Sequence, residues 1–416
     1  MRKRARSLIA SSILVLVAAT ASEADRSPID LKSAVERGLP ALELNGFQEG
    51  VPWDTLGAAL PTAGLLARMA HYGVPGLGIA VVQDGAVAWA EGYGVLEAGR
   101  EAPVTRLTRF EAASASKAVT AVAVLRFVDR GLLDIDADVN TLLTSWNAPE
   151  NEHTGAHKVT VRRLLTHTAG INRPDGGFSV EPGSAPTTAQ VLRGERPAVN
   201  TAAAVEFIPG SMHQYSNMGY VILQLLLEEA GGKPFPELME DEVFLPLGME
   251  RSGYETEAGG ARGSDFPRHH GADGEPLESA LFPGALAHGG LRTTPADLAR
   301  LIAEMSACYR GETAGLLSPR IVRAAFSAER RFSPDGFLGF AAQGLGVFLL
   351  QTDHGPCFCH PGHNMPGATC FYFGFPETGQ GAVVMTNGVR GLELSFEVLC
   401  AIASIYDWPS IRVQSS

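Results

Sequence analysis

The sequence of 416 residues contains little cysteine and little charge. Its five cysteines are too few for a fold that depends on disulfide bonds, although Cys357 or Cys359 could face Cys370 across a hairpin. Charged residues make up only 19% of the chain, and the excess of acidic residues gives a formal net charge of −12. Nucleic acids and anionic membranes repel such a protein. We therefore expect no nucleic-acid partner, and the composition leaves small-molecule substrates open.

Several common functional motifs are also absent. The chain has no Gly-x-Ser-x-Gly sequence, and this absence disfavours an α/β-hydrolase. It has no glycine-rich loop that ends in Gly-Lys-Ser or Gly-Lys-Thr, and no dinucleotide-binding fingerprint. The sequence therefore implies no cofactor. Its hydrophobic content of 45% is sufficient for a globular protein with a sizeable core.

The first 21 residues are typical of an export signal. A basic head at 2–6 precedes an apolar run from Leu8 to Ala19, and Ala19-Thr20-Ala21 matches a small-residue cleavage site. The apolar run is short for a membrane span, although an uncleaved anchor stays an alternative. We predict a signal peptide at 1–21, no stable membrane insertion beyond it, and a periplasmic or secreted protein.

Strand patterns lie towards both ends of the chain, and helical patterns lie between them. Two apolar runs flank Asp84-Gly85 and predict a β-hairpin over 74–95. Helical patterns follow at 114–130, 160–171, 219–232 and 294–308. We predict an N-terminal extension at 22–60, a discontinuous sheet domain at 61–134 and 286–416, and a helical, loop-rich subdomain at 135–285. The active site is expected where the two parts meet.

The stretch from Phe110 to Gly131, FEAASASKAVTAVAVLRFVDRG, predicts an apolar helix with two serines and a lysine in its first turn. Ser114 and Lys117 share one helix face, about 5–6 Å apart at Cβ. Burial disfavours the charged form of a lysine, which can then help to remove the proton of a serine hydroxyl. The alternative is that Ser114 or Ser116 caps the helix and that Lys117 extends to solvent.

Two later segments carry further polar motifs. Residues 215–217 are Tyr-Ser-Asn before an apolar helix, and residues 360–362 are His-Pro-Gly at the start of a strand. Ser-x-x-Lys, Tyr-x-Asn and a basic-x-Gly triplet, in this order, resemble the serine β-lactamase and penicillin-binding-protein superfamily. The segments LLTHTAG and HGGLRTTPADLARL are most similar to its class C β-lactamase, D-Ala-D-Ala carboxypeptidase and esterase branch. The resemblance covers residues from about 60 to 406.

This resemblance implies an α+β fold, in which helices cover both faces of an antiparallel β-sheet and a mostly helical subdomain is inserted. It also implies a serine hydrolase that forms an acyl-enzyme on Ser114 with an ester, amide, β-lactam or D-Ala-D-Ala peptide. Lys117 would lie against Ser114 and keep Tyr215 poised as a proton acceptor, and which of the two takes the serine proton stays open. Asn217 would hydrogen-bond Lys117 and the substrate. The alternative function is a non-catalytic penicillin-binding or sensor protein with the same fold.

The third motif departs from the family pattern. The β-lactamases have Lys-Thr-Gly there, and the lysine and threonine hold the substrate carboxylate. His360 has an ordinary pKa of about 6.5 and is expected to be only partly charged, while Pro361 has no hydroxyl group. We therefore expect weaker carboxylate recognition and a preference for esters or amides. The resemblance implies that Gly362 and His363 belong to the binding site, with the backbone N–H groups of His363 and Ser114 as the oxyanion hole.

Other histidines and cysteines receive different interpretations. The Cys and His side chains of 357–363 could ligate a metal, but strand alternation points them to opposite sides, so we expect no metal site. His167 is interpreted as a hydrogen-bonding residue near the cleft. His288 is expected near the cleft without an assigned role. The pair at 269–270 is expected to lie in a solvated loop.

Overall fold

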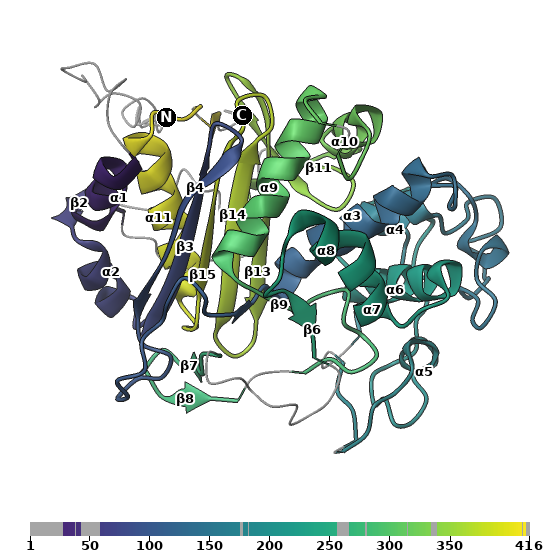
Figure 1. Cartoon of the computed structure of the whole chain (residues 1–416). Coiled ribbons are helices and arrows are strands. Elements are labelled where there is room, and N and C mark those ends of the chain that lie inside the picture. Colours follow the sequence, from purple (N-terminus) through teal and green to yellow (C-terminus); the bar gives the residue numbers. More distant parts are fainter. Residues whose placement is uncertain are drawn as a thin grey trace, which may run out of the picture.

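The computed structural model describes residues 28–37, 39–42, 59–174, 178–181, 183–255, 266–278, 281–313, 315–333, 339–409 and 411–412. The predicted signal segment at 1–21 lies outside these residues, and so does much of the predicted extension at 22–60. A large antiparallel sheet lies at the centre of the folded structure (Figure 1).

The central sheet joins a hairpin from the first quarter of the chain to strands from the last quarter. Its strand order is β10 (Arg330–Arg331), β11 (Ala342–Gln343), β12 (Phe348–Thr352), β13 (Gly355–Asn364), β14 (Ala368–Phe375), β15 (Gln380–Thr386), β3 (Gly76–Gln83) and β4 (Ala86–Gly94), and β16 (Ile411–Arg412) pairs with β12. The predicted hairpin is confirmed as β3 and β4. Asp84 and Gly85 form its turn at φ 53° and 75°, as Asp-Gly turns require.

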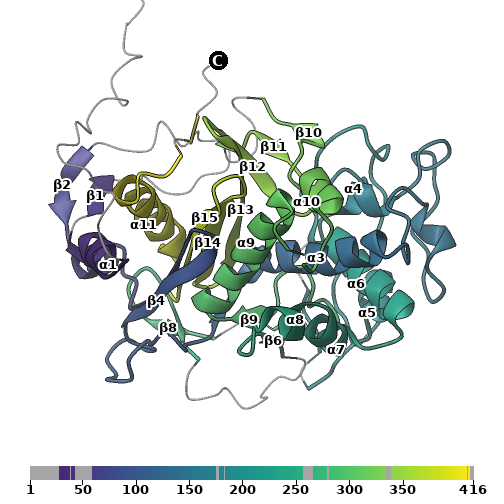
Figure 2. The same ribbon diagram turned by 45° about the horizontal axis from the view of Figure 1, so that its top comes forward.

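One face of the sheet is covered by helices from both ends of the chain. These are α1 (Pro28–Arg37), α2 (Leu65–His71) and α11 (Gly391–Ile405), seen on one side of the strands in Figures 1 and 2. Leu77, Ile79 and Val81 of β3 pack towards them, while Ala80 and Val82 pack into the core on the opposite face. Burial on both faces explains why these strands are continuous apolar runs.

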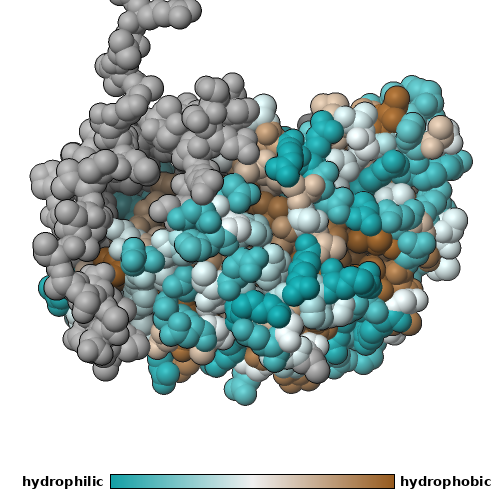
Figure 3. Space-filling model, turned by 90° about the horizontal axis from the view of Figure 1, so that it is seen from above, coloured by the Kyte–Doolittle hydropathy of each residue, from teal (hydrophilic) through white to brown (hydrophobic). Residues whose placement is uncertain are grey.

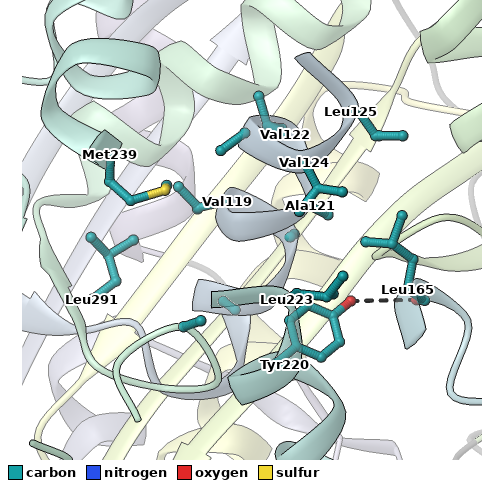
Figure 4. Packing of buried hydrophobic residues seen from close by; sticks show 14 of the residues in the cluster. Val119, Ala121, Val122, Val124, Leu125, Leu165, Tyr220, Leu223, Met239 and Leu291 are labelled. Carbon is teal, nitrogen blue, oxygen red and sulfur yellow. Dashed lines mark hydrogen bonds between the residues drawn. The ribbon is translucent and has the colours of Figure 1, made fainter. Parts of the chain in front are cut away.

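The opposite face packs on α3 (Ser116–Asp129) and α9 (Pro295–Arg310), and α10 (Pro319–Ala325) lies beside α9. Further helical elements gather on this side of the sheet (Figure 1). They are η3 (Val139–Thr141), α4 (Val161–Leu165), α5 (Thr188–Arg193), α6 (Asn217–Gly231), α7 (Phe235–Met239), the π-helical turn η4 (Glu240–Phe244) and α8 (Leu245–Leu247). In Figure 4, Val119 and Val122 of α3 lie in the same core as Tyr220 and Leu223 of α6.

Short strands complete the described structure. β5 (Phe110–Glu111), β9 (Leu291–Thr293) and β6 (Gly253–Tyr254) form a small sheet, β7 (His269–His270) pairs with β8 (Pro276–Leu277), and β1 (Leu39–Leu42) pairs with β2 (Ala59–Ala63). The expected α+β fold, with helices on both faces of an antiparallel sheet, is confirmed. The division into two domains at the boundaries given above stays a prediction.

The described residues form no helix that is both long and apolar enough to cross a membrane. The face shown in Figure 3 is mostly hydrophilic, and its hydrophobic residues lie in separate patches.

A buried ion pair fastens α2 to α11. Arg68 Nε and Nη2 donate to the two carboxylate oxygens of Glu397 at 2.7 and 2.9 Å, and the side chains are 6% and 0% exposed. The Tyr72 hydroxyl donates to the same carboxylate at 3.0 Å, and burial, followed by the charge of Glu397, raises the pKa of Tyr72 to about 12. Loss of the carboxylate would leave a buried guanidinium without its counter-charge.

We expect Glu397→Gln to lower the free energy of unfolding by about 3–5 kcal/mol, since one partner of a buried pair is removed. Urea unfolding measures this loss. The control is Lys233→Ala, which breaks a pair with Asp241 whose side chains are 52% and 45% exposed. The control should change the free energy by less than about 1 kcal/mol. Equal effects of the two substitutions would contradict the stabilising role of the buried pair.

Candidate active site

Ser114 lies in a tight turn between β5 and α3. The turn is the 3-10 segment η2 (Ala113–Ala115), and α3 begins only at Ser116, so the predicted helix starts two residues later than expected. Ala113 adopts φ 47°, which is strained for a residue with a Cβ atom. Its neighbours Ala112 and Ala115 are fully buried, whereas Ser114 is partly exposed. The fold therefore presents one hydroxyl from an otherwise buried turn.

The alternative in which a serine caps the helix is wrong, because neither η2 nor α3 has a side-chain cap. Ser116 Oγ instead donates to the carbonyl of Ala113 at 2.6 Å and accepts the N–H of Leu291 at 3.1 Å. Ser116 thus ties the turn to β9.

Lys117 is fully buried, so the alternative in which it extends to solvent is wrong. Its Nζ lies 3.1 Å from Ser114 Oγ and donates to the carbonyl of His288 at 2.6 Å. It also lies over the rings of Tyr215 and Tyr220, at 4.8 and 5.7 Å from their centroids. Burial lowers the pKa of Lys117 well below its usual value because the charged form loses its hydration.

Tyr215 lies two residues before α6, and it contacts both Ser114 and Lys117 of the first motif. A hydrogen bond with Ser114 lowers the pKa of Tyr215, but burial raises it more, so the phenol is favoured over the phenolate. The ring packs against His167 at 4.3 Å between centroids, and His167 Nδ1 accepts the N–H of Ser216 at 3.1 Å. The fold therefore brings Ser114, Lys117 and Tyr215 together, and His167 forms the kind of structural hydrogen bond that the sequence predicts.

Asn217 does not make the hydrogen bond with Lys117 that was expected. Its Oδ1 is the atom that could accept from an amine, and it is buried without a hydrogen-bond partner in the described part of the chain. The neighbouring Ser216, rather than Asn217, anchors the start of α6. Ser216 Oγ accepts the N–H of Gly219 at 3.2 Å and donates to the carbonyl of Asn172 at 2.7 Å.

Gly362 of β13 packs directly on the turn that carries Ser114. A Cβ atom at this position would lie 2.2 Å from the carbonyl oxygen of Ala112, so only glycine permits the contact. Strand alternation then points the side chain of His363 to the other face, where it is exposed and lies within the electrostatic reach of Glu393 of α11.

The sequence suggested that His360 is partly charged, but the structure favours the neutral imidazole. Its side chain is 2% exposed, and Nδ1 lies 2.7 Å from the carbonyl oxygen of Pro361. Burial, and then the neighbouring Lys117, lowers the pKa of His360 to about 3. A neutral imidazole gives little attraction to a substrate carboxylate.

The cysteines form neither a disulfide nor a metal cluster in the described residues. All five are free thiols. Cys357 and Cys359 pack on the α11 face of the sheet, whereas Cys370 belongs to the opposite core, so the pairing that the sequence left possible across the hairpin does not form. No group of three or more His, Cys, Asp or Glu side chains in the described chain is arranged to hold a metal ion.

Three further histidines differ from expectation or gain a contact. His269 and His270 are 2% and 0% exposed, so the solvated loop predicted for them is wrong. His270 Nε2 accepts the N–H of Ala98 at 3.0 Å, and the ring of His269 faces the carboxylate of Glu111. His288, which had no assigned role, supplies the carbonyl that holds Lys117.

Sequence reasoning also missed Arg173. It is exposed, and its charge acts on Tyr215 and His167, whose pKa values are set mainly by burial and are lowered slightly by Arg173. It follows Asn172, the residue whose carbonyl anchors Ser216. No motif spacing signals such a residue, because it comes from a separate loop.

Comparisons with known proteins agree with this architecture. The family model described as Beta-lactamase matches residues 65–404. Penicillin-binding protein 4 of Amycolatopsis lactamdurans is 29% identical over 346 residues, which cover 79% of this chain and 84% of that protein. Esterase EstB of Burkholderia gladioli is 34% identical over 171 residues, but these cover only 40% of this chain and 43% of the esterase.

Solved structures give the same result for the fold. The hydrolase EstCE1, described as having promiscuous acyltransferase activity, aligns with a TM-score of 0.67 at 21% identity, over 81% of this chain and 96% of that one. The octameric penicillin-binding protein homologue from Pyrococcus abyssi aligns with a TM-score of 0.65 at 23% identity, over 83% and 76%. The family model spans most of the chain and the motifs occur in the order that the resemblance implied, so the chain belongs to the Beta-lactamase family.

Proposed function

We propose that the protein is a serine hydrolase that forms an acyl-enzyme on Ser114 with ester or amide substrates. The observation that carries this proposal is the buried amine of Lys117, 3.1 Å from Ser114 Oγ and held by the carbonyl of His288 at 2.6 Å. An amine without water around it loses its proton readily, and a neutral amine can accept the proton of a hydroxyl.

In the proposed reaction, Ser114 Oγ attacks the carbonyl carbon of the substrate while its proton passes to neutral Lys117. Burial lowers the pKa of the amine and raises that of Tyr215, so both groups start uncharged. The developing oxyanion is held by the backbone N–H groups of Ser114 and His363. Tyr215, hydrogen-bonded to Ser114, relays the proton to the leaving group as the tetrahedral intermediate collapses. Water then attacks the acyl-enzyme by the reverse proton path.

The remaining motif residues are proposed to bind the substrate. Asn217 presents a buried oxygen without a partner, which suits an N–H group of the substrate. Neutral His360 and Gly362 form the wall of the site but supply no fixed positive charge. The exposed cation at this site is Arg173. We therefore favour esters and amides without an obligatory carboxylate over D-Ala-D-Ala peptides and β-lactams.

The export pattern at 1–21 supports a periplasmic or secreted enzyme. The alternative function is a penicillin-binding or sensor protein that is acylated without turnover. It is kept because penicillin-binding protein 4 of Amycolatopsis lactamdurans is among the relatives.

We expect Ser114→Ala to reduce hydrolysis of a short-chain p-nitrophenyl ester by about ten-thousandfold or more, as loss of a nucleophile does. Steady-state kinetics measure this, and intact-mass spectrometry should detect a transient acyl adduct in the unaltered protein only. Ser327→Ala, which removes an exposed hydroxyl remote from the site, is the control. Undiminished turnover by Ser114→Ala would refute the assignment, and a long-lived adduct without product would support the sensor.

The pH dependence should follow Lys117. Since the neutral amine is the active form, kcat/KM for the ester should be low at acid pH and rise through the depressed pKa of Lys117, well below the usual value of 10.5. Lys117→Arg keeps a permanent positive charge and should remain inactive across the whole pH range. A rising limb near 10.5, or an active arginine variant, would contradict a role for the neutral amine.

Substrate preference tests the third motif. With neutral His360 in place of lysine, kcat/KM should be higher for the p-nitrophenyl ester than for nitrocefin, whose carboxylate needs a cationic partner. Parallel kinetics with both chromogenic substrates give the ratio. Efficient nitrocefin hydrolysis without esterase activity would overturn the proposed preference.

A further inference from the structure

Three successive backbone carbonyls, those of residues 287–289, are each held by a side chain. Thr120 and Lys117, which lie three residues apart on α3, donate to the first and second of them at 3.0 and 2.6 Å. Asn364 Nδ2, at the end of β13, donates to the third at 3.0 Å. We call residues 287–289 the carbonyl segment. Its middle carbonyl is the one that positions the amine of Lys117.

The carbonyl segment needs such a restraint at its C-terminal end. Its last residue, Gly289, is followed by Gly290, and both glycines donate their N–H groups to the carbonyl of Leu286, at 3.3 and 2.8 Å. These bonds leave the carbonyl of Gly289 to be held by Asn364. A Cβ atom on Gly289 would lie 3.2 Å from Asn364 Oδ1, so the two residues are in close contact. Asn364 is therefore the side chain that holds the carbonyl at the C-terminal end of the segment.

Asn364 is itself held in one orientation. Its Nδ2 also donates to Glu111 Oε2 at 3.1 Å, so both amide hydrogens are directed to acceptors and the amide has only one satisfactory placement. Glu111 is 4% exposed, and its Oε1 lies 3.5 Å from both His269 Nε2 and Arg292 Nη2. A buried carboxylate with these neighbours is a firm anchor for the amide.

The same pair connects the three segments that meet at the site. Glu111 ends β5, three residues before Ser114, and Asn364 ends β13, two residues after Gly362. The hydrogen bond between them joins the nucleophile strand to the third-motif strand. The second bond of Asn364 adds the carbonyl segment that faces Lys117.

We propose that Asn364, anchored by Glu111, is a positioning residue that holds the carbonyl segment and thereby aims the amine of Lys117 at Ser114. The inference rests on the proposed function, because it takes Lys117 as the activator of Ser114. The hydrogen bonds of Asn364 reach Glu111 and Gly289, not Ser114 or Lys117. Its effect therefore belongs in the acylation rate rather than in substrate affinity.

The test compares Asn364→Leu with a paired exchange, Glu111→Gln with Asn364→Asp. In the exchange, the new amide at 111 can donate to the new carboxylate at 364, so the bond between the two side chains is restored. A carboxylate cannot donate to the carbonyl of Gly289, so that bond stays lost. The exchange also conserves the net charge of the pair, although the carboxylate moves from position 111 to position 364.

We expect Asn364→Leu to lower kcat for the p-nitrophenyl ester, and the rate of adduct formation, by roughly ten- to a hundredfold, with KM within about twofold of the unaltered value. The paired exchange should regain thermal stability towards that of the unaltered protein while acylation stays slow. If acylation recovers together with stability, the role of Asn364 is structural and the proposal is overturned.

Asn387→Leu is the matched control. Asn387 is also a buried asparagine just beyond a strand, where Oδ1 accepts the N–H of Gly76 at 2.7 Å and Nδ2 donates to the carbonyl of Leu96 at 3.2 Å. This variant should lose stability without a change in kcat. A fall in kcat equal to that of Asn364→Leu would contradict the proposal. If the unaltered protein forms no adduct on Ser114, the proposed function itself fails, which is a different result from an adduct that forms at the same rate in all variants.

Discussion

The burial of one amine is the constraint on which the rest of the site depends. Lys117 lies on a mostly apolar helix and is fully buried between the rings of Tyr215 and Tyr220 and the carbonyl of His288. Desolvating a charged amine is unfavourable, and the protein reduces this penalty by favouring the neutral form. Burial thus destabilises the charged ammonium form of Lys117 and leaves a neutral amine, which can act as a base beside Ser114. Reactivity in the proposed mechanism is thus a consequence of packing.

Close backbone contacts hold the Ser114 turn, β13 and the carbonyl segment together around Lys117. Gly362 lets β13 reach the turn of Ser114, and the strained backbone of Ala113 turns the hydroxyl out of a buried segment. The carbonyl segment approaches Lys117 from a third direction. These contacts come from three separate parts of the chain, at 112–117, 287–289 and 362–364, so a stable sheet with helices on both faces is required to hold them in register. The buried pair of Arg68 and Glu397 contributes to that stability from the far face.

Much of the fold could be predicted from local patterns. Asp84-Gly85 defined a hairpin, Gly131 follows α3 with a positive φ, and the order of strand and helix patterns indicated the α+β class. The proximity of Ser114 and Lys117 followed from helical spacing. Properties set by tertiary neighbours could not be predicted in this way. The charge state of His360 depends on its burial beside Lys117. The burial of His269 and His270 depends on the short β7–β8 hairpin, where His270 also forms a β-bridge with Gly388. The hydrogen bond expected between Asn217 and Lys117 depends on tertiary placement in the same way, and Asn217 Oδ1 is buried without a partner in the described residues.

The most direct test of the central claim is the titration of Lys117 itself. The chain has only five lysines, so NMR of protein with isotope-labelled lysine can follow each side-chain amine separately, and Lys117→Met identifies the signal. The account predicts one amine that titrates well below the usual 10.5 and whose signal disappears in that variant. An amine at Lys117 that stays protonated up to the usual lysine range would contradict it.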